Sequence, residues 1–307
     1  RVYGTVMENR EGKGPCYLRT EGISKEQEQD LYKAYLNMAP SQTLKWMEAG
    51  KGPSEENVEI EGTEPYIVGG HTASGYWVDN NRATTIEGLY AAGDVAGGCP
   101  QKYVTGALAE GEIAAEAILE YLNGKDDDRI AAENKEEALE RGGEQELSQT
   151  AIAKKAEYES HLNASRSLMN AEQLEEAMQK IMDQYAGGIG TDYRYSGMSL
   201  AKADEKIAAL LPVVDTLAAT DTYELMQIYE LRERLIVCQA VIAHLAARKE
   251  TRWHSFGENT DYPQQSEEWM KYVNSRMENG EIKILYRDLI TKENTGLNTA
   301  EKGAGER

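Results

Sequence analysis

Apolar residues three and four positions apart form the most regular pattern in this chain, and the longest such stripe follows residue 170. Asn170 and Gln173 have the spacing of a capping box, in which each side chain satisfies the main-chain N–H of the other residue. The apolar positions that follow are Leu174, Ala177, Met178, Ile181, Met182 and Tyr185. This spacing predicts an amphipathic helix that begins after Asn170 and ends before Gly187.

Two further helices are predicted downstream, over residues 199–214 and 223–249. Asp221 and Glu224 repeat the capping-box spacing at the start of the second of them. Its stretch 235–247 is apolar nearly all round, which is typical of a helix at the centre of a bundle. The second half of the chain is therefore predicted to be predominantly a helical bundle.

The first half mixes helical and strand-like patterns. Helices are predicted at 25–38 and 44–49, and short β-like apolar runs occur at 66–68 and 76–78. Near the C-terminus, the pattern predicts one more strand at 282–286. These short runs indicate an α/β region rather than a second bundle.

The segment 85–98 places an aspartate in a glycine-rich turn. Residues 89–92 are predicted to form a buried strand that delivers Asp94 into this turn, and a helix is predicted from Thr105 to about residue 122. Glycine lets the backbone approach a ligand closely, and a helix N-terminus offers free N–H groups and a positive dipole end. A carboxylate here is suited to accept hydrogen bonds from a chain of hydroxyls, although an ordinary strand–turn–helix with a solvated aspartate has the same pattern.

Composition narrows the classes of function. The chain has 307 residues, 40% of them hydrophobic, and a net charge of −20 with a pI of about 4.7. That charge argues against nucleic acid as a partner, because phosphate binding relies on Lys and Arg. No apolar run is long enough to predict a transmembrane segment. Three dispersed cysteines and four dispersed histidines lack metal-ligand spacing, so we expect no metal site and reduced thiols in a cytoplasmic protein.

Three features resemble known flavoproteins. The string from Thr85 to Gly98 resembles the second cofactor-binding motif of FAD-dependent oxidoreductases, in which the acidic residue contacts the ribityl chain of the flavin. His71, with a small-residue turn after it, stands where succinate dehydrogenases and fumarate reductases carry a histidine that faces the substrate. The segment from Arg248 to Arg252 resembles the Glu-Ser-Arg segment that closes the helical domain of that superfamily.

One departure separates this chain from the dicarboxylate enzymes. Those enzymes carry a catalytic arginine just after the acidic residue, whereas this sequence has no arginine between Arg82 and Arg129. Several of its motifs are instead similar to those of adenylylsulfate reductase α subunits. The motifs are Lys13-Gly-Pro-Cys-Tyr, Thr63-Glu-Pro-Tyr, Gly-Gly-His71, the run 91–103 (Ala-Ala-Gly-Asp-Val-Ala-Gly-Gly-Cys-Pro-Gln-Lys-Tyr), Glu250-Thr-Arg-Trp and Glu258-Asn-Thr-Asp-Tyr-Pro.

The resemblance implies a fold of α/β plus all-α type. Residues 1–60 would be the end of a capping domain, and residues 61–124 the C-terminal part of a Rossmann-like FAD-binding domain. Residues 125–260 would form the helical domain and 261–307 a C-terminal extension. The first part of the helical domain, 125–149, is so rich in charge that a linker or an exposed helix is expected. The N-terminal GxGxxG fingerprint of such flavoproteins is absent, so the sequence looks like the C-terminal part of a longer protein.

The same resemblance implies the activity and the site. The expected reaction is the two-electron reduction of adenosine 5′-phosphosulfate to AMP and sulfite at FAD, or its reverse. His71 is the expected catalytic residue, as a donor to the developing negative charge. Arg252 and His254 are weaker candidates for substrate contacts, with an inter-domain salt bridge as the alternative. The residues expected to bind FAD are Gly93, Asp94, Tyr103, Val104, Thr105 and Gly106.

Electrons must reach the flavin from a partner, because this sequence offers no cluster ligands. In the family a small iron–sulfur β subunit with two [4Fe–4S] clusters supplies them, and such a partner is expected here. Two other interpretations stay open. One is another FAD-dependent enzyme of the succinate and fumarate superfamily that acts on an organic acid. The other is a non-catalytic helical interaction module.

Overall fold

The computed structural model describes residues 2–60, 74–97, 104–164, 168–252 and 257–289. The chain divides into two units, Arg1–Glu64 and Pro65–Arg307. This division does not test the four-part organisation expected from the sequence, which stays a prediction. No helix in the described ranges is both long and apolar enough to cross a membrane.

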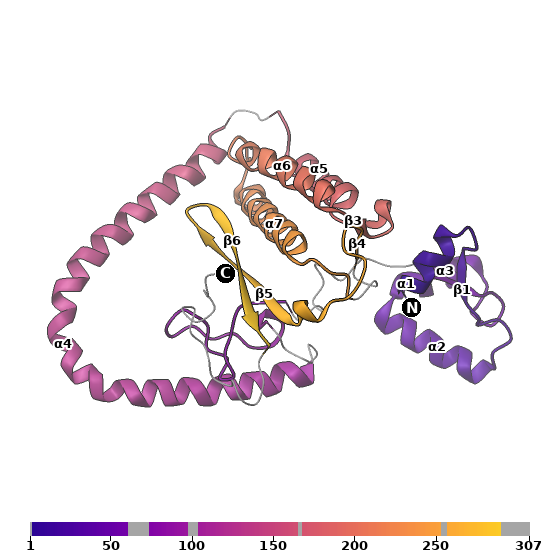
Figure 1. Cartoon of the computed structure of the whole chain (residues 1–307), viewed down its shortest axis with the longest axis horizontal. Coiled ribbons are helices and arrows are strands. Elements are labelled where there is room, and N and C mark those ends of the chain that lie inside the picture. The colour runs from indigo at the N-terminus through magenta and orange to yellow at the C-terminus, as the bar shows by residue number, and fades with distance from the viewer. Residues whose placement is uncertain (1, 61–73, 98–103, 165–167, 253–256, 290–307) are drawn as a thin grey trace. The chain divides into compact units, whose positions relative to one another are not determined.

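The first unit consists of three helices and a two-stranded sheet (Figure 1). Its elements are α1 (Val2–Arg10), β1 (Cys16–Leu18), α2 (Lys25–Met38), α3 (Pro40–Ala49) and β2 (Val58–Ile60), with β1 and β2 antiparallel. The two helices predicted from periodicity are confirmed. Ser24 caps α2 in a capping box with Gln27, and α3 ends at Gly50 in the left-handed conformation. Trp46 is buried between the ring edges of Tyr32 and Tyr35.

Among the described residues of the second unit there are four α-helices and two two-stranded sheets, which Figure 1 shows. Its helices are α4 (Val104–Leu162), α5 (Ala171–Tyr185), α6 (Gly197–Val214) and α7 (Thr222–Ala247). The strands are β3 (Arg194–Tyr195) parallel to β4 (Glu258–Asn259), and β5 (Lys271–Glu278) antiparallel to β6 (Glu281–Asp288). Single 3-10 turns lie at Gly93–Val95 (η1), Ile189–Thr191 (η2) and Glu267–Trp269 (η3). The helix predicted from Thr105 continues far beyond residue 122, through the charged segment at 125–149.

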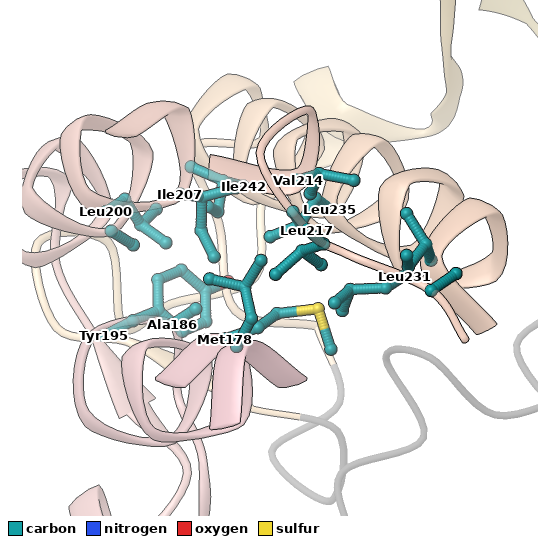
Figure 2. Close-up of a cluster of buried hydrophobic side chains, with 14 residues drawn as sticks. Met178, Ala186, Tyr195, Leu200, Ile207, Val214, Leu217, Leu231, Leu235 and Ile242 are labelled. Atoms are coloured by element: carbon teal, nitrogen blue, oxygen red, sulfur yellow. The ribbon is translucent and has the colours of Figure 1, made fainter. Parts of the chain in front are cut away.

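Helices α5, α6 and α7 pack together around the main hydrophobic core, as the periodicity predicted (Figures 1 and 2). Leu174 of α5, Ile207 of α6 and Leu235 of α7 are fully buried there. Asn170 caps α5 in a complete capping box with Gln173. The bundle is thus built from apolar stripes with capped ends, which are features that a sequence pattern displays directly.

Two details of α7 differ from the prediction. Its C-terminal half is not buried all round, because Leu235 and Ile242 are buried while Val237 is 52% exposed. The helix is nevertheless central among the described elements, since it contacts α4, α5, α6 and both strands of the C-terminal hairpin. At the N-terminus Asp221 caps the helix, but the Glu224 carboxylate accepts from the N–H of Thr220 and not from that of Asp221. The capping box is therefore only half formed.

The strand predictions had mixed outcomes. The strand predicted at 282–286 lies within β6 and is confirmed, but its partner β5 was missed. The signal was present in Asn279-Gly280, where both residues have positive φ (51° and 82°) at the turn between the strands, a combination that Asn-Gly favours. The strand predicted at 89–92 is wrong. A ladder needs an adjacent strand, and the described residues give this run a single bridge, from Tyr90 to Ala83.

Candidate functional site

The turn that carries Asp94 is built on a glycine with a positive φ. Gly93 has φ 73°, and the N–H of Ala96 donates to its carbonyl at 3.0 Å to close the turn η1. A Cβ atom on Gly93 would lie 3.2 Å from the Cβ of Ala107 on α4. Both the backbone conformation and this close approach favour glycine. The Asp94 turn therefore lies directly against the beginning of α4, and Asp94 itself is exposed.

A second segment runs beside the turn and is joined to it through the main chain. The N–H of Tyr76 donates to the carbonyl of Val95 at 2.7 Å, and the N–H of Gly97 donates to the carbonyl of Tyr76 at 2.8 Å. A small buried cluster next to these hydrogen bonds consists of Val78, Ala91 and Ala96. The run 76–78 predicted as β-like thus forms isolated bridges rather than an extended strand, one from Tyr76 to Ala96 at the turn and one from Val78 to Thr84.

A buried carboxylate anchors the turn from α4. Glu110 is 4% exposed, and its Oε2 accepts from the N–H of Gly93 at 3.1 Å. The same oxygen lies 3.4 Å from Nε of Arg82, whose Nη1 also donates to the carbonyls of Asp79 and Asn80. A buried charge is tolerated when it is both paired and hydrogen-bonded, as here.

Glu110 was not predicted as a site residue, although the sequence held a signal for it. Glu110 stands three residues after Ala107 and four before Ala114, so the three residues share one face of α4. Ala107 of this face lies against the Asp94 turn, and Ala114 is buried in the interior. A glutamate on such a face needs a partner. Its partners, Arg82 and the Gly93 N–H, are separated from it by 28 and 17 residues, and no local pattern connects them.

The predicted flavin-binding residues are partly brought together. Gly93 and Asp94 lie in the turn, and Val104, Thr105 and Gly106 make up the first turn of α4, whose N–H groups have no partners within the helix. The contacts of Gly93 with Ala107 and Glu110 hold these two parts of the site side by side. His71, Tyr103 and His254 lie outside the described residues. Their positions stay predictions.

Arg252 belongs to a buried ion-pair cluster at the end of α7. Its Nε and Nη2 donate to the two carboxylate oxygens of Glu250 at 2.9 Å, and Arg248 donates to the same carboxylate at 2.8 Å. Arg252 also donates to the carbonyl of Ser266, whose N–H donates to Glu250. Burial of Glu250 raises its pKa, but the hydrogen bonds from Arg252, Ser266 and Arg248 outweigh this and hold the pKa below its usual value. The substrate role of Arg252 stays a prediction.

Metal-binding chemistry has little support in the described ranges, which contain no grouping of three His, Cys, Asp or Glu residues able to hold an ion. Cys16 and Cys238 are free thiols. Burial raises the pKa of Cys238 to about 11, so this thiol is neutral at physiological pH.

Comparison with known proteins identifies relatives along nearly the whole chain. Residues 175–301 match the family model of the fumarate reductase flavoprotein C-terminus. The adenylylsulfate reductase subunit alpha of Megalodesulfovibrio gigas is 29% identical over 90% of this chain and 46% of its own length. This chain is a relative of adenylylsulfate reductase α subunits. The resemblance predicted from the motifs is therefore confirmed.

Two solved structures agree with this relationship. The adenylylsulfate reductase of Archaeoglobus fulgidus superimposes with a TM-score of 0.77 at 29% identity, over 95% of this chain and 50% of that one. An adenosine-5-phosphosulfate reductase in complex with sulfite, as a covalent adduct, gives a TM-score of 0.71 at 28% identity over the same shares. A quinol fumarate reductase chain of E. coli also superimposes, with a TM-score of 0.63 at 18% identity over 93% of this chain and 47% of that one, so the predicted fold class is confirmed. The chain spans about half the length of the relatives it matches.

Proposed function

We propose that this chain is part of the flavoprotein subunit of an adenylylsulfate reductase. The reaction is the two-electron reduction of adenosine 5′-phosphosulfate to AMP and sulfite, or its reverse. The observation that carries this proposal is the match of 95% of the chain to a structure that holds sulfite as a covalent adduct. FAD, when bound, supplies the two-electron exchange with sulfur.

The residues around Asp94 fit the requirements of a flavin. Gly93 lets the turn pack closely on α4, where a Cβ atom would lie 3.2 Å from that of Ala107, and this packing holds Asp94 at the beginning of the helix. The exposed Asp94 carboxylate accepts hydrogen bonds from ribityl hydroxyls. The N–H groups of Val104, Thr105 and Gly106, in the first turn of α4, would hold the pyrimidine edge of the flavin, where the N-terminal end of the helix dipole would favour negative charge. Tyr103, the residue before Val104, is proposed as a further flavin-binding residue from its place in the motif.

His71 is proposed as the catalytic residue that acts on the substrate. As an imidazole N–H donor it hydrogen-bonds an oxyanion of the sulfonyl group and stabilises the charge that develops as AMP departs. Arg252 and His254 are secondary candidates for contacts with the anionic substrate. The support for all three is their place in the matching motifs.

An iron–sulfur β subunit with [4Fe–4S] clusters is the proposed electron partner. The relative from Megalodesulfovibrio gigas is itself named as an alpha subunit, which supports an assembly with a second chain. We propose a cytoplasmic location for the complex, in keeping with free Cys16 and Cys238.

The two alternative functions are less well supported. An enzyme for dicarboxylates needs a cation after the acidic residue, and the sequence has no arginine between Arg82 and Arg129. An interaction module without a cofactor does not require the glycine, the buried carboxylate and the exposed aspartate that occur together at the turn. Both alternatives remain outcomes of the experiment below.

The test is an anaerobic assay of the full-length protein with its partner, following sulfite-dependent reduction of an artificial acceptor with and without AMP. We expect strict dependence on AMP. Asp94→Ala should lower bound FAD and activity together, whereas Glu112→Gln, at an exposed position of α4, should change neither. Bound flavin without AMP dependence would favour the organic-acid enzyme, and a protein that binds no flavin would favour the interaction module.

A further inference from the structure

Arg287 of β6 connects the C-terminal hairpin, β5 and β6, to the segment beside the Asp94 turn. Arg287 lies opposite Tyr272 in the hairpin ladder, and its guanidinium carbon is 4.7 Å from the centroid of the Tyr272 ring. The centroid of the Trp77 ring lies 4.3 Å from the same carbon. Nη1 of Arg287 also donates to the carbonyl of Val78 at 3.4 Å. The guanidinium is therefore held by two aromatic rings and one main-chain acceptor.

This contact depends on stacking more than on hydrogen bonds. Nε of Arg287 and Nε1 of Trp77 are both buried and have no hydrogen-bond partner among the described residues. Burial lowers the pKa of Arg287, while Tyr272 acts in the opposite direction, and a guanidinium remains charged at neutral pH. Its weak hydration and planar shape make it suited to lie between rings away from water.

The segment that Arg287 holds is the one that positions the Asp94 turn. Val78, whose carbonyl accepts from Arg287, packs with Ala91 and Ala96 on either side of the turn. Tyr76, next to the stacked Trp77, makes the two main-chain hydrogen bonds to residues 95 and 97. Trp77 is adjacent in the chain to both Tyr76 and Val78. We therefore expect a displacement of the Trp77 ring to move the turn through the contacts of these two residues.

The hairpin is itself fixed to the helical part of the unit. Nε2 of His244 on α7 lies 2.8 Å from Oγ of Ser275 on β5. The ring of Trp269, the last residue of η3, makes an edge-type contact with Tyr286 of β6, with the two ring centroids 5.7 Å apart. One face of the hairpin therefore contacts α7, and Arg287 extends from it to the Asp94 segment.

We propose that Arg287 is a positioning residue for the Asp94 turn, and that through it the C-terminal hairpin sets the affinity of the turn for FAD. That the ligand of the turn is FAD rests on the proposed function. The contacts themselves make a prediction about the backbone of residues 76–97 that holds with or without a flavin.

The experiment compares Arg287→Ala and Arg287→Lys with two controls in the full-length protein. Arg276→Ala removes an exposed arginine of the same hairpin that pairs with Glu278. Leu174→Ala destabilises the bundle core far from this contact in the chain. The readouts are the Kd for FAD, the visible circular dichroism of the bound flavin, and hydrogen exchange of the amides of residues 76 and 97 with and without FAD.

We expect Arg287→Ala to weaken FAD binding about tenfold or more, change the flavin dichroism and accelerate exchange at both amides. Arg287→Lys should show a smaller change in the same direction, because an ammonium group does not fill the space between two rings. The controls should leave these readouts unchanged, even where Leu174→Ala lowers global stability. If both Arg287 variants match the controls in exchange and in FAD affinity, the proposal is wrong.

The two proposals fail in different ways. A wild-type protein that binds no FAD contradicts the proposed function, and the exchange comparison without flavin still decides whether Arg287 holds the turn. A wild-type protein that binds FAD, with Arg287→Ala changing global unfolding alone, supports the function and overturns the positioning role. If Arg287→Ala does not fold, Arg287→Lys carries the same comparison.

Discussion

The helical bundle and the Asp94 turn are stabilised by different kinds of interaction. The bundle buries many large side chains from α5, α6 and α7 in one continuous core (Figure 2). The turn has a core of only Val78, Ala91 and Ala96, and depends on main-chain hydrogen bonds and the carboxylate of Glu110. Stability in the bundle comes from apolar area, whereas the turn depends on the identity of particular residues.

The largest effect is expected in the bundle. Leu235 is fully buried on α7, and Leu235→Ala removes its apolar side chain and leaves a cavity. We expect a loss of about 3–4 kcal/mol in the free energy of unfolding, measured by denaturant with far-ultraviolet circular dichroism.

The matched control for this change is Val237→Ala, because Val237 lies two residues away on the exposed face of α7. It should cost well under about 1 kcal/mol. Equal losses for the two variants would mean that the face carrying Val237 is covered in the protein. That outcome would contradict the exposure of Val237.

A smaller but more local effect is expected at the anchor of the turn. Glu110→Gln keeps an oxygen for the N–H of Gly93 but removes the charge that faces Arg82. We expect a cost of about 2–3 kcal/mol, since Arg82 is left without its buried counter-charge. Hydrogen exchange should accelerate at the turn and much less in α5, α6 and α7.

The double variant Glu110→Gln with Arg82→Met sharpens this prediction. Removal of both charges should recover part of the loss, because no unpaired charge remains buried. If the double variant loses as much as the two single variants added together, the two side chains do not interact. The turn would then be stabilised by its hydrogen bonds, including that from the Gly93 N–H to residue 110, and not by an ion pair with Arg82.

The sequence predicted the bundle well for a physical reason. Helical periodicity and caps are local, so Leu174 and its neighbours and the Asn170 cap are visible in a short window. It predicted the composition of the Asp94 turn for a similar reason, because glycine and a helix start are local signals. It failed for residues 89–92, where strand formation depends on a partner elsewhere in the chain.

The support around the turn could not be predicted because it joins distant segments. Glu110 approaches Gly93 across 17 residues, and Arg287 approaches Val78 across 209. Neither the spacing nor the residue types of such pairs differ from those of ordinary surface charges. Only the fold shows that these side chains are buried and what they contact.

The smallest effect is expected from a single methyl group in the turn. Gly93→Ala places an L side chain at φ 73° and its Cβ 3.2 Å from Ala107. We expect a loss of about 1–2 kcal/mol, from the left-handed conformation together with a slight displacement of α4. FAD affinity should fall by more than this stability loss accounts for, because a turn pushed away from α4 displaces the Asp94 carboxylate proposed to bind the ribityl chain. Gly88→Ala, at φ 77° with its nearest neighbour 3.6 Å away, is the control for backbone strain alone. If the two variants bind FAD equally well, the close packing of Gly93 on α4 does not set the position of Asp94, and the turn would be less sensitive to single residues than proposed.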